Sequence, residues 1–186
     1  EFCISNKTMS YEDYRDCRDL DLSVEIFLND AIFNDLFQFL ETFGVSRTDF
    51  FKKMHERVVS GETVLTKIYR DYRGEEERNH WNSREKAMEF IKQPDVVERY
   101  IAGEFGVNEI QKYRTIAVCR HLDVLHEVAF AAARSLLGDE AKDEDVDLYL
   151  TELCEFSLMR KSDFWKLDKK FKKTFHFDFM ELARNN

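Results

Sequence analysis

Two acid–histidine pairs at helical spacing are candidate metal ligands in this sequence. Glu77 and His80 form a Glu-x-x-His, and Asp123 with His126 forms a weaker second pair. Di-iron helix bundles use two Glu-x-x-His pairs and two further glutamates that project inward. The set is incomplete here, and Glu77 lies in a very polar run that we expect to face solvent. Solvated helix faces are the favoured interpretation, and a metal-binding helix bundle is retained as an alternative.

Two histidines, His121 and His126, could donate a proton or contact a ligand. His121 and His126 are five residues apart, so on one helix they point about 140° away from each other. They are poorly placed to share a ligand. We expect one of them to be partly buried with its hydrogen bonds satisfied and the other to be exposed, and a proton donor in a cleft is the functional alternative.

The turn Gly103-Glu-Phe-Gly-Val-Asn108 precedes a helix N-terminus, a place where backbone N–H groups can hold an anion. It is not a dinucleotide-binding Gly-x-Gly-x-x-Gly loop, because it has two glycines and no strand is predicted before it. A tight inter-helix turn capped by Asn108 is the favoured interpretation. The candidate substrate or domain contacts at this end of the chain are Gly103, Glu104, Gly106, Asn108, Tyr113, Arg114 and His121.

No set of residues suggests a nucleophilic enzyme. Gly-x-Ser-x-Gly is absent, and Cys3, Cys17, Cys119 and Cys154 form no Cys-x-x-Cys pair. A disulfide framework or zinc knuckle is therefore not indicated, and reduced cytosolic thiols are expected. The sequence supplies no catalytic residue and no metal ligand set of its own.

The element that must position these residues is a helix predicted over about 108–137. This segment contains no glycine or proline, and Gly138 suits a C-terminal cap. About 30 residues at ~1.5 Å each give a helix of roughly 45 Å. Its second half, Val128–Ala133, is apolar on every face, as expected of a central helix with neighbours on several sides.

Apolar residues at helical spacing predict further helices on either side of this one. We expect one all-α domain over 1–186, an irregular multi-helix bundle with an irregular lead-in at 1–9. Ser10, Ser46 and Ser83 are predicted N-caps. The basic and aromatic tail at 166–186 alternates polar with apolar residues around Phe177, which predicts a short strand or an extended segment laid across the helices.

Composition limits the possible partners. The chain has 186 residues and a net charge of −9, which argues against nucleic-acid binding. No apolar run approaches the ~18 residues that span a bilayer, so no membrane span is predicted. We expect a cytoplasmic location. Because the first residue is Glu1, we also expect the chain to be a fragment of a longer protein.

Several stretches are similar to the C-terminal region of cobalamin-binding radical S-adenosylmethionine proteins. Residues 11–30 (YEDYRDCRDLDLSVEIFLND) resemble the segment just past the barrel of these enzymes. The stretch from Asn82–Glu85 through Pro94 to Tyr100 and the stretch Gly103–Arg114 resemble their C-terminal helical region, and the Phe177–Phe179 ending also looks like theirs.

The resemblance implies an isolated accessory domain. The Cys-x-x-x-Cys-x-x-Cys motif that holds the iron–sulfur cluster is absent, so no catalytic residue carries over. The iron–sulfur cluster, S-adenosylmethionine and cobalamin would belong to the parent. Its N-terminal cobalamin-binding and radical barrel domains would be the partners, and this domain would shape or cover the active site. A free-standing helical protein-interaction module is the main alternative.

Overall fold

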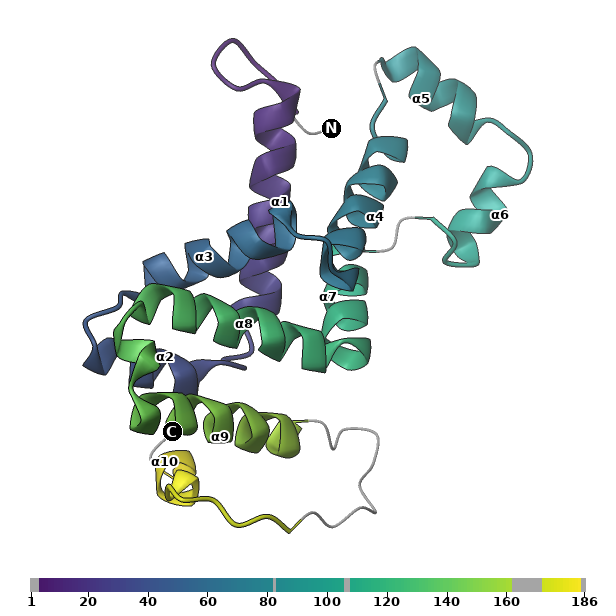
Figure 1. Cartoon of the computed structure of the whole chain (residues 1–186). Coiled ribbons are helices and arrows are strands. Elements are labelled where there is room, and N and C mark those ends of the chain that lie inside the picture. The colour runs from purple at the N-terminus through teal and green to yellow at the C-terminus, as the bar shows by residue number, and fades with distance from the viewer. Residues whose placement is uncertain (1–3, 82, 106–107, 162–171, 185–186) are drawn as a thin grey trace.

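The computed structural model describes residues 4–81, 83–105, 108–161 and 172–184. These residues form helices, and no strand occurs among them, which confirms the predicted all-α class. The helices are α1 (Tyr11–Phe27), α2 (Asn34–Thr42), α3 (Arg47–Ser60), α4 (Val64–Arg78), α5 (Arg84–Ile91), α6 (Val96–Ile101), α7 (Glu109–Arg120), α8 (Leu122–Leu137), the short 3-10 helix η1 (Glu140–Lys142), α9 (Glu144–Lys161) and α10 (Phe179–Arg184) (Figure 1).

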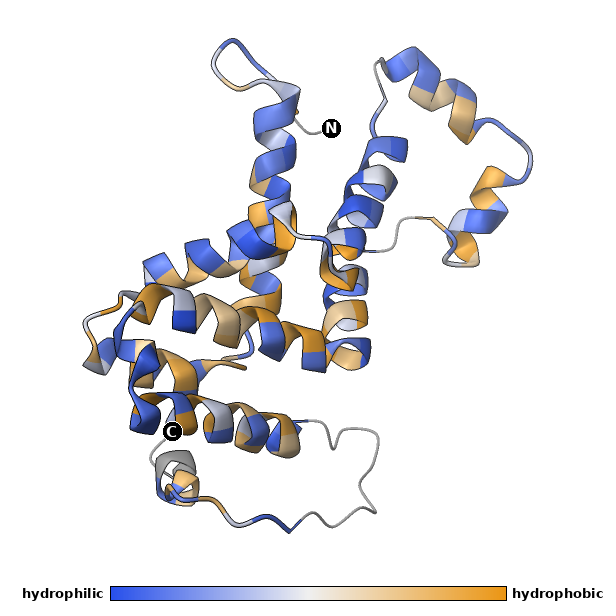
Figure 2. Ribbon diagram, in the orientation of Figure 1, coloured by the Kyte–Doolittle hydropathy of each residue, from blue (hydrophilic) through white to orange (hydrophobic). Residues whose placement is uncertain are grey.

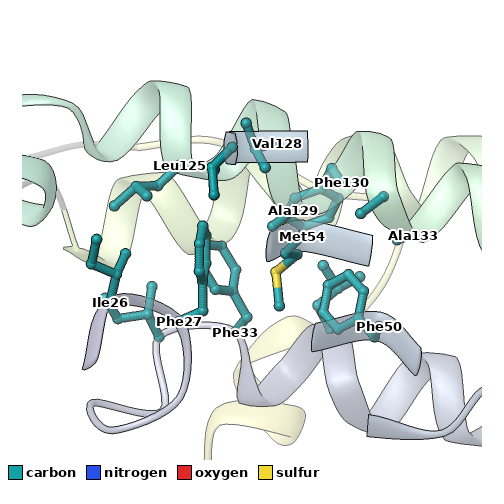
Figure 3. Close-up of a cluster of buried hydrophobic side chains, with 14 of the residues drawn as sticks. Ile26, Phe27, Phe33, Phe50, Met54, Leu125, Val128, Ala129, Phe130 and Ala133 are labelled. Atoms are coloured by element: carbon teal, nitrogen blue, oxygen red, sulfur yellow. The ribbon is translucent and has the colours of Figure 1, made fainter. Parts of the chain in front are cut away.

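Helix α8 lies at the centre of the main body, between α3 and α9 (Figure 1). Its alanines Ala129, Ala132 and Ala133 are each 0% exposed. Their small side chains let the neighbouring helices come close, and large side chains such as Phe33 and Phe50 fill the space around them (Figure 3). The apolar second half of the predicted long helix is therefore the centre of the core, as expected.

The single helix predicted over 108–137 is wrong in its first half. The chain leaves helical geometry at His121 (φ −136°, ψ 34°), so that α7 and α8 are separate helices running in different directions (Figure 1). Helix α7 buries Tyr113 and Ala117 while it packs on α1 and α4, whereas α8 packs on α3 and α9. One straight rod could not reach both sets of neighbours, so tertiary packing outweighs the helical propensity of the sequence.

The predicted N-caps are confirmed. Ser10 and Asp13 form a reciprocal capping box at the start of α1. Ser46, Ser83 and Asn108 each accept a backbone N–H at the start of their helices.

The C-terminal tail follows the extended alternative. Residues 172–178 are non-helical and α10 follows, so no strand forms in this described part of the tail. Phe179 is 2% exposed and joins the core, and Phe175 and Phe177 pack against it. Buried Glu152 of α9 accepts the backbone N–H of His176 at 2.8 Å and its ring Nδ1 at 2.7 Å, which fixes the tail on α9. The first part of the predicted tail, 166–171, lies outside the described residues.

Helices α5 and α6 form an arm that projects from the main body (Figure 1). Val96 of α6 is 1% exposed, yet it is not part of the main hydrophobic core. The arm therefore lies outside the main hydrophobic core.

Candidate functional site

The arm is shaped by short helices with well-defined ends. Ser83 Oγ accepts the Lys86 N–H at 3.3 Å and starts α5. After α6 the chain turns at Gly103, whose φ of +76° lies in the left-handed region that favours glycine. Asn108 Oδ1 accepts the Gln111 N–H at 3.2 Å and starts α7, which returns the chain to the main body.

A row of four aromatic rings lines the arm. Successive centroid distances are 4.7 Å from Trp81 to Phe90, 5.7 Å from Phe90 to Phe105 and 5.3 Å from Phe105 to Tyr100. Trp81 and Tyr100 remain 40% and 46% exposed. Rings from the connections before α5 and after α6 therefore share one surface with rings from the helices themselves.

Polar side chains from α4 and α7 face this row across a groove of about 570 Å³. Glu75 accepts hydrogen bonds from Lys112 Nζ at 2.6 and 2.8 Å and from the Tyr113 hydroxyl at 2.7 Å. Asn79 Nδ2 donates to Glu109 Oε1 at 2.7 Å. The lining residues are Glu75, Arg78, Asn79, Trp81, Phe90, Tyr100, Glu104, Phe105, Glu109 and Lys112.

The charges in this groove suit binding better than proton transfer. Burial acts to raise the pKa of Glu75, but the hydrogen bonds from Lys112 and Tyr113 outweigh it and leave that pKa below its ordinary value. Burial and the neighbouring Glu75 raise the pKa of Tyr113. At neutral pH the carboxylate is therefore ionised and the phenol is neutral, so neither group is ready to exchange a proton.

The predicted contact residues divide between this groove and other places. Glu104 lines the groove, while Gly103 and Asn108 build the turn that borders it. Tyr113 reaches it through Glu75. Gly106 lies outside the described residues.

Arg114 and His121 do not line the groove. Arg114 donates to Asp30 and lies 4.0 Å from Glu25 of α1. His121 is half-buried at the break between α7 and α8. The aromatic row was not predicted, and the sequence carries no clear signal of it, because aromatic residues between Trp81 and Phe105 are about as frequent as in the chain as a whole.

A second polar cluster resembles a catalytic set but lies inside the core. His126 Nδ1 donates to the Leu122 carbonyl at 2.8 Å, so the neutral ring accepts the Ser157 hydroxyl at Nε2, 2.9 Å away. Lys161 Nζ donates to Ser157 Oγ at 2.6 Å and also to the Ile32 carbonyl. His126 is 0% and Ser157 3% exposed, so no substrate reaches the hydroxyl, and the cluster joins α8 to α9.

The ionisation of this cluster follows from its burial. Burial lowers the pKa of His126 to about 4 and that of Lys161 to about 8. The expectation of one satisfied histidine is met by His126, which is fully rather than partly buried. His121 is half-buried rather than exposed.

A third cluster joins α1 to α4. Arg73 donates to Asp19 and Asp16 at 2.6 Å each and to Glu12 at 3.0 Å. Ser23, 0% exposed, lies 2.6 Å from the Tyr69 hydroxyl. Burial raises the pKa of Asp19 to about 6 despite the bond from Arg73. These contacts hold two helices together.

The two acid–histidine pairs do not converge on a metal. His80 Nδ1 lies 3.0 Å from the Tyr11 hydroxyl and Glu77 is exposed, as expected. His126 is engaged with Ser157, and Asp123 is exposed. Within the described ranges, no group of three or more His, Cys, Asp or Glu side chains is placed to hold a metal ion. None of the described helices combines the length and apolarity needed to cross a bilayer.

Comparison of the chain with family models, with curated proteins and with solved structures found no match.

Proposed function

We propose that this chain is a non-catalytic helical accessory domain that docks on a partner protein through the arm formed by α5 and α6. One observation carries the proposal: the arm exposes large apolar side chains. Figure 2 shows apolar segments on both of its helices. The exposed side chains are Met88 at 42%, Ile91 at 46%, Val97 at 50%, Tyr100 at 46% and Ile101 at 82% exposure.

Concentrated apolar exposure of this kind on two adjacent short helices is typical of an interaction surface. Covering a side chain such as Ile101 contributes about 1.5–3 kcal/mol to association. Several such side chains must be covered together to offset the cost of immobilising the partners.

The resemblance noted in the sequence supports a particular partner. It favours the N-terminal cobalamin-binding and radical barrel domains of one parent chain in the cytoplasm, whose active site this domain would cover or shape. The iron–sulfur cluster, S-adenosylmethionine and cobalamin would all be held by those domains. A free-standing interaction module uses the same arm but binds a protein encoded elsewhere.

Lysine cross-linking of the natively expressed gene product tests docking through the arm and the identity of the partner. Lys86 and Lys92 are exposed on the arm, so docking is expected to give cross-links from them. Ile101→Asp should remove these cross-links. Leu20→Asp, at a comparably apolar exposed position on α1, is the matched control and should leave them unchanged.

The identity of the cross-linked peptide then separates the alternatives. A peptide from upstream in the same reading frame, together with a Cys-x-x-x-Cys-x-x-Cys motif there, supports the accessory domain of a radical enzyme. A peptide from a different gene supports the free-standing module. Cross-links that persist in the Ile101→Asp variant would contradict docking through the arm.

A further inference from the structure

The groove beside the arm combines exposed aromatic faces with carboxylates. Trp81 and Tyr100 are the exposed ends of the aromatic row, unlike the core rings Phe33 and Phe50, which are 1% and 0% exposed. The face of an aromatic ring carries negative potential and attracts a cation. One wall of the groove is therefore suited to a positively charged group.

The carboxylates of the groove are not equally neutralised. Glu75 is paired with Lys112 at 2.6 Å, and Glu104 with Arg99 at 2.7 Å. Glu109 instead accepts a hydrogen bond from the neutral Asn79 amide, and no cationic side chain in the described part of the chain forms an ion pair with it. Arg78 lines the same groove, but Glu109 keeps an acceptor oxygen for a further donor.

The arm already binds one guanidinium in the way that the groove could bind another. The Arg99 guanidinium carbon lies 4.1 Å from the centroid of the Phe105 ring, and Arg99 Nε donates to Glu104. Arginine suits such a site because its planar head stacks on a ring while its N–H groups donate to a carboxylate. A lysine ammonium carries the charge but cannot stack.

From this pattern we infer that the groove binds the guanidinium of an arginine side chain presented by the partner protein, between the aromatic row and Glu109. The inference rests on the proposed docking function and adds the chemistry of one contact. A basic partner also agrees with the net charge of −9 of the chain. The groove is thereby the part of the interface that selects the partner, while the apolar face of the arm supplies affinity.

Titration with small probes tests the groove separately from docking. The probe is N-acetyl-arginine amide, and its uncharged isostere N-acetyl-citrulline amide and N-acetyl-lysine amide are the comparisons. The readout is the indole N–H resonance of Trp81, identified by its loss in Trp81→Phe. We expect saturable shifts with the arginine amide, several-fold weaker binding of the lysine amide and no shift with the citrulline amide.

Two variants of equal charge change supply the control. Glu109→Gln keeps an oxygen for the Asn79 bond and should weaken binding of the arginine amide by about five- to tenfold. Glu98→Gln, on the exposed surface of α6 outside the groove, should bind as the unmodified protein does.

Three results would overturn the inference: citrulline or lysine amides that bind as well as arginine amide, a Trp81 resonance that does not move, or a Glu109→Gln variant with unchanged affinity. None of these three results would contradict docking through the arm, which the cross-linking tests separately. If the unmodified protein gave no arm cross-links but bound the arginine amide normally, docking would be refuted and the groove would remain a site for guanidinium compounds.

Discussion

The buried His126 makes the stability of the folded protein sensitive to acid. In the folded protein burial lowers the pKa of this ring from 6.5 to about 4. The unfolded chain therefore takes up a proton as the pH falls below 6.5, whereas the folded chain does so only near 4. Because protons bind preferentially to the unfolded state in this window, the contribution of His126 to stability is present above pH 6.5 and is lost as the pH falls.

The magnitude follows from the gap between the two pKa values. At about 1.36 kcal/mol per pH unit, the difference between 6.5 and about 4 corresponds to about 3 kcal/mol. Between pH 7 and pH 4.5, about 2 kcal/mol of this is lost. Asp19 acts in the opposite direction, because its pKa is raised to about 6 in the folded protein, so stability from that group increases as the pH falls.

The two effects partly cancel in the unmodified protein, so the test compares it with a His126→Gln variant that keeps Asp19. Urea unfolding gives the free energy of unfolding of both proteins at pH 7 and pH 4.5. The variant is expected to be less stable at pH 7, and its deficit should shrink by about 2 kcal/mol at pH 4.5 because glutamine does not titrate. A deficit of the same size at both pH values would refute the reasoning. If the variant does not fold, NMR titration of the histidine ring decides instead, and a His126 that titrates at pH 6 or above is the refuting result.

Three further predictions concern the core, the Arg73 cluster that joins α1 to α4, and the Glu152–His176 contact that holds the tail on α9. Ala132→Phe should overpack the fully buried face of α8 and lower the free energy of unfolding by about 1–3 kcal/mol in urea, and an unchanged value would mean that this face can expand. Arg73→Met should cost roughly 3 kcal/mol, since it leaves the buried Asp19 carboxylate without its cation, and the Arg73→Met/Asp19→Asn double variant should recover part of the loss. No recovery would show that the charge of Asp19 is not the cause. Glu152→Ala should speed limited proteolysis of residues 172–178, because the backbone and ring of His176 lose their acceptor, and an unaltered cleavage pattern would argue that the aromatic contacts alone hold the tail.

Features that depend on a few neighbouring residues could be predicted from the sequence. The capping box of Ser10 and Asp13 and the cap at Asn108 involve side chains within three residues of the N–H groups that they bind, so local chemistry is sufficient. The burial of α8 followed from its composition, since a helix that is apolar on all faces has no stable place at the surface.

The groove could be predicted only in part. The turn at Gly103 was singled out because glycine and asparagine have specific backbone roles, and the structure places Glu104 beside the aromatic row. The opposing Glu75 and Lys112 could not have been paired in advance, because they come from helices that are separated along the chain by the whole arm.

The sequence by itself determined the all-helical class, the helix starts and the apolar centre of the domain, since these follow from hydrophobic periodicity and short-range hydrogen bonding. Only the tertiary structure decided that the helix expected over 108–137 breaks at His121 and that the arm stands away from the main body. No glycine or proline marks the break, because its cause lies in the different neighbours of α7 and α8. The direction of a helix is set by the surfaces it must bury, and these surfaces exist only when the chain has folded.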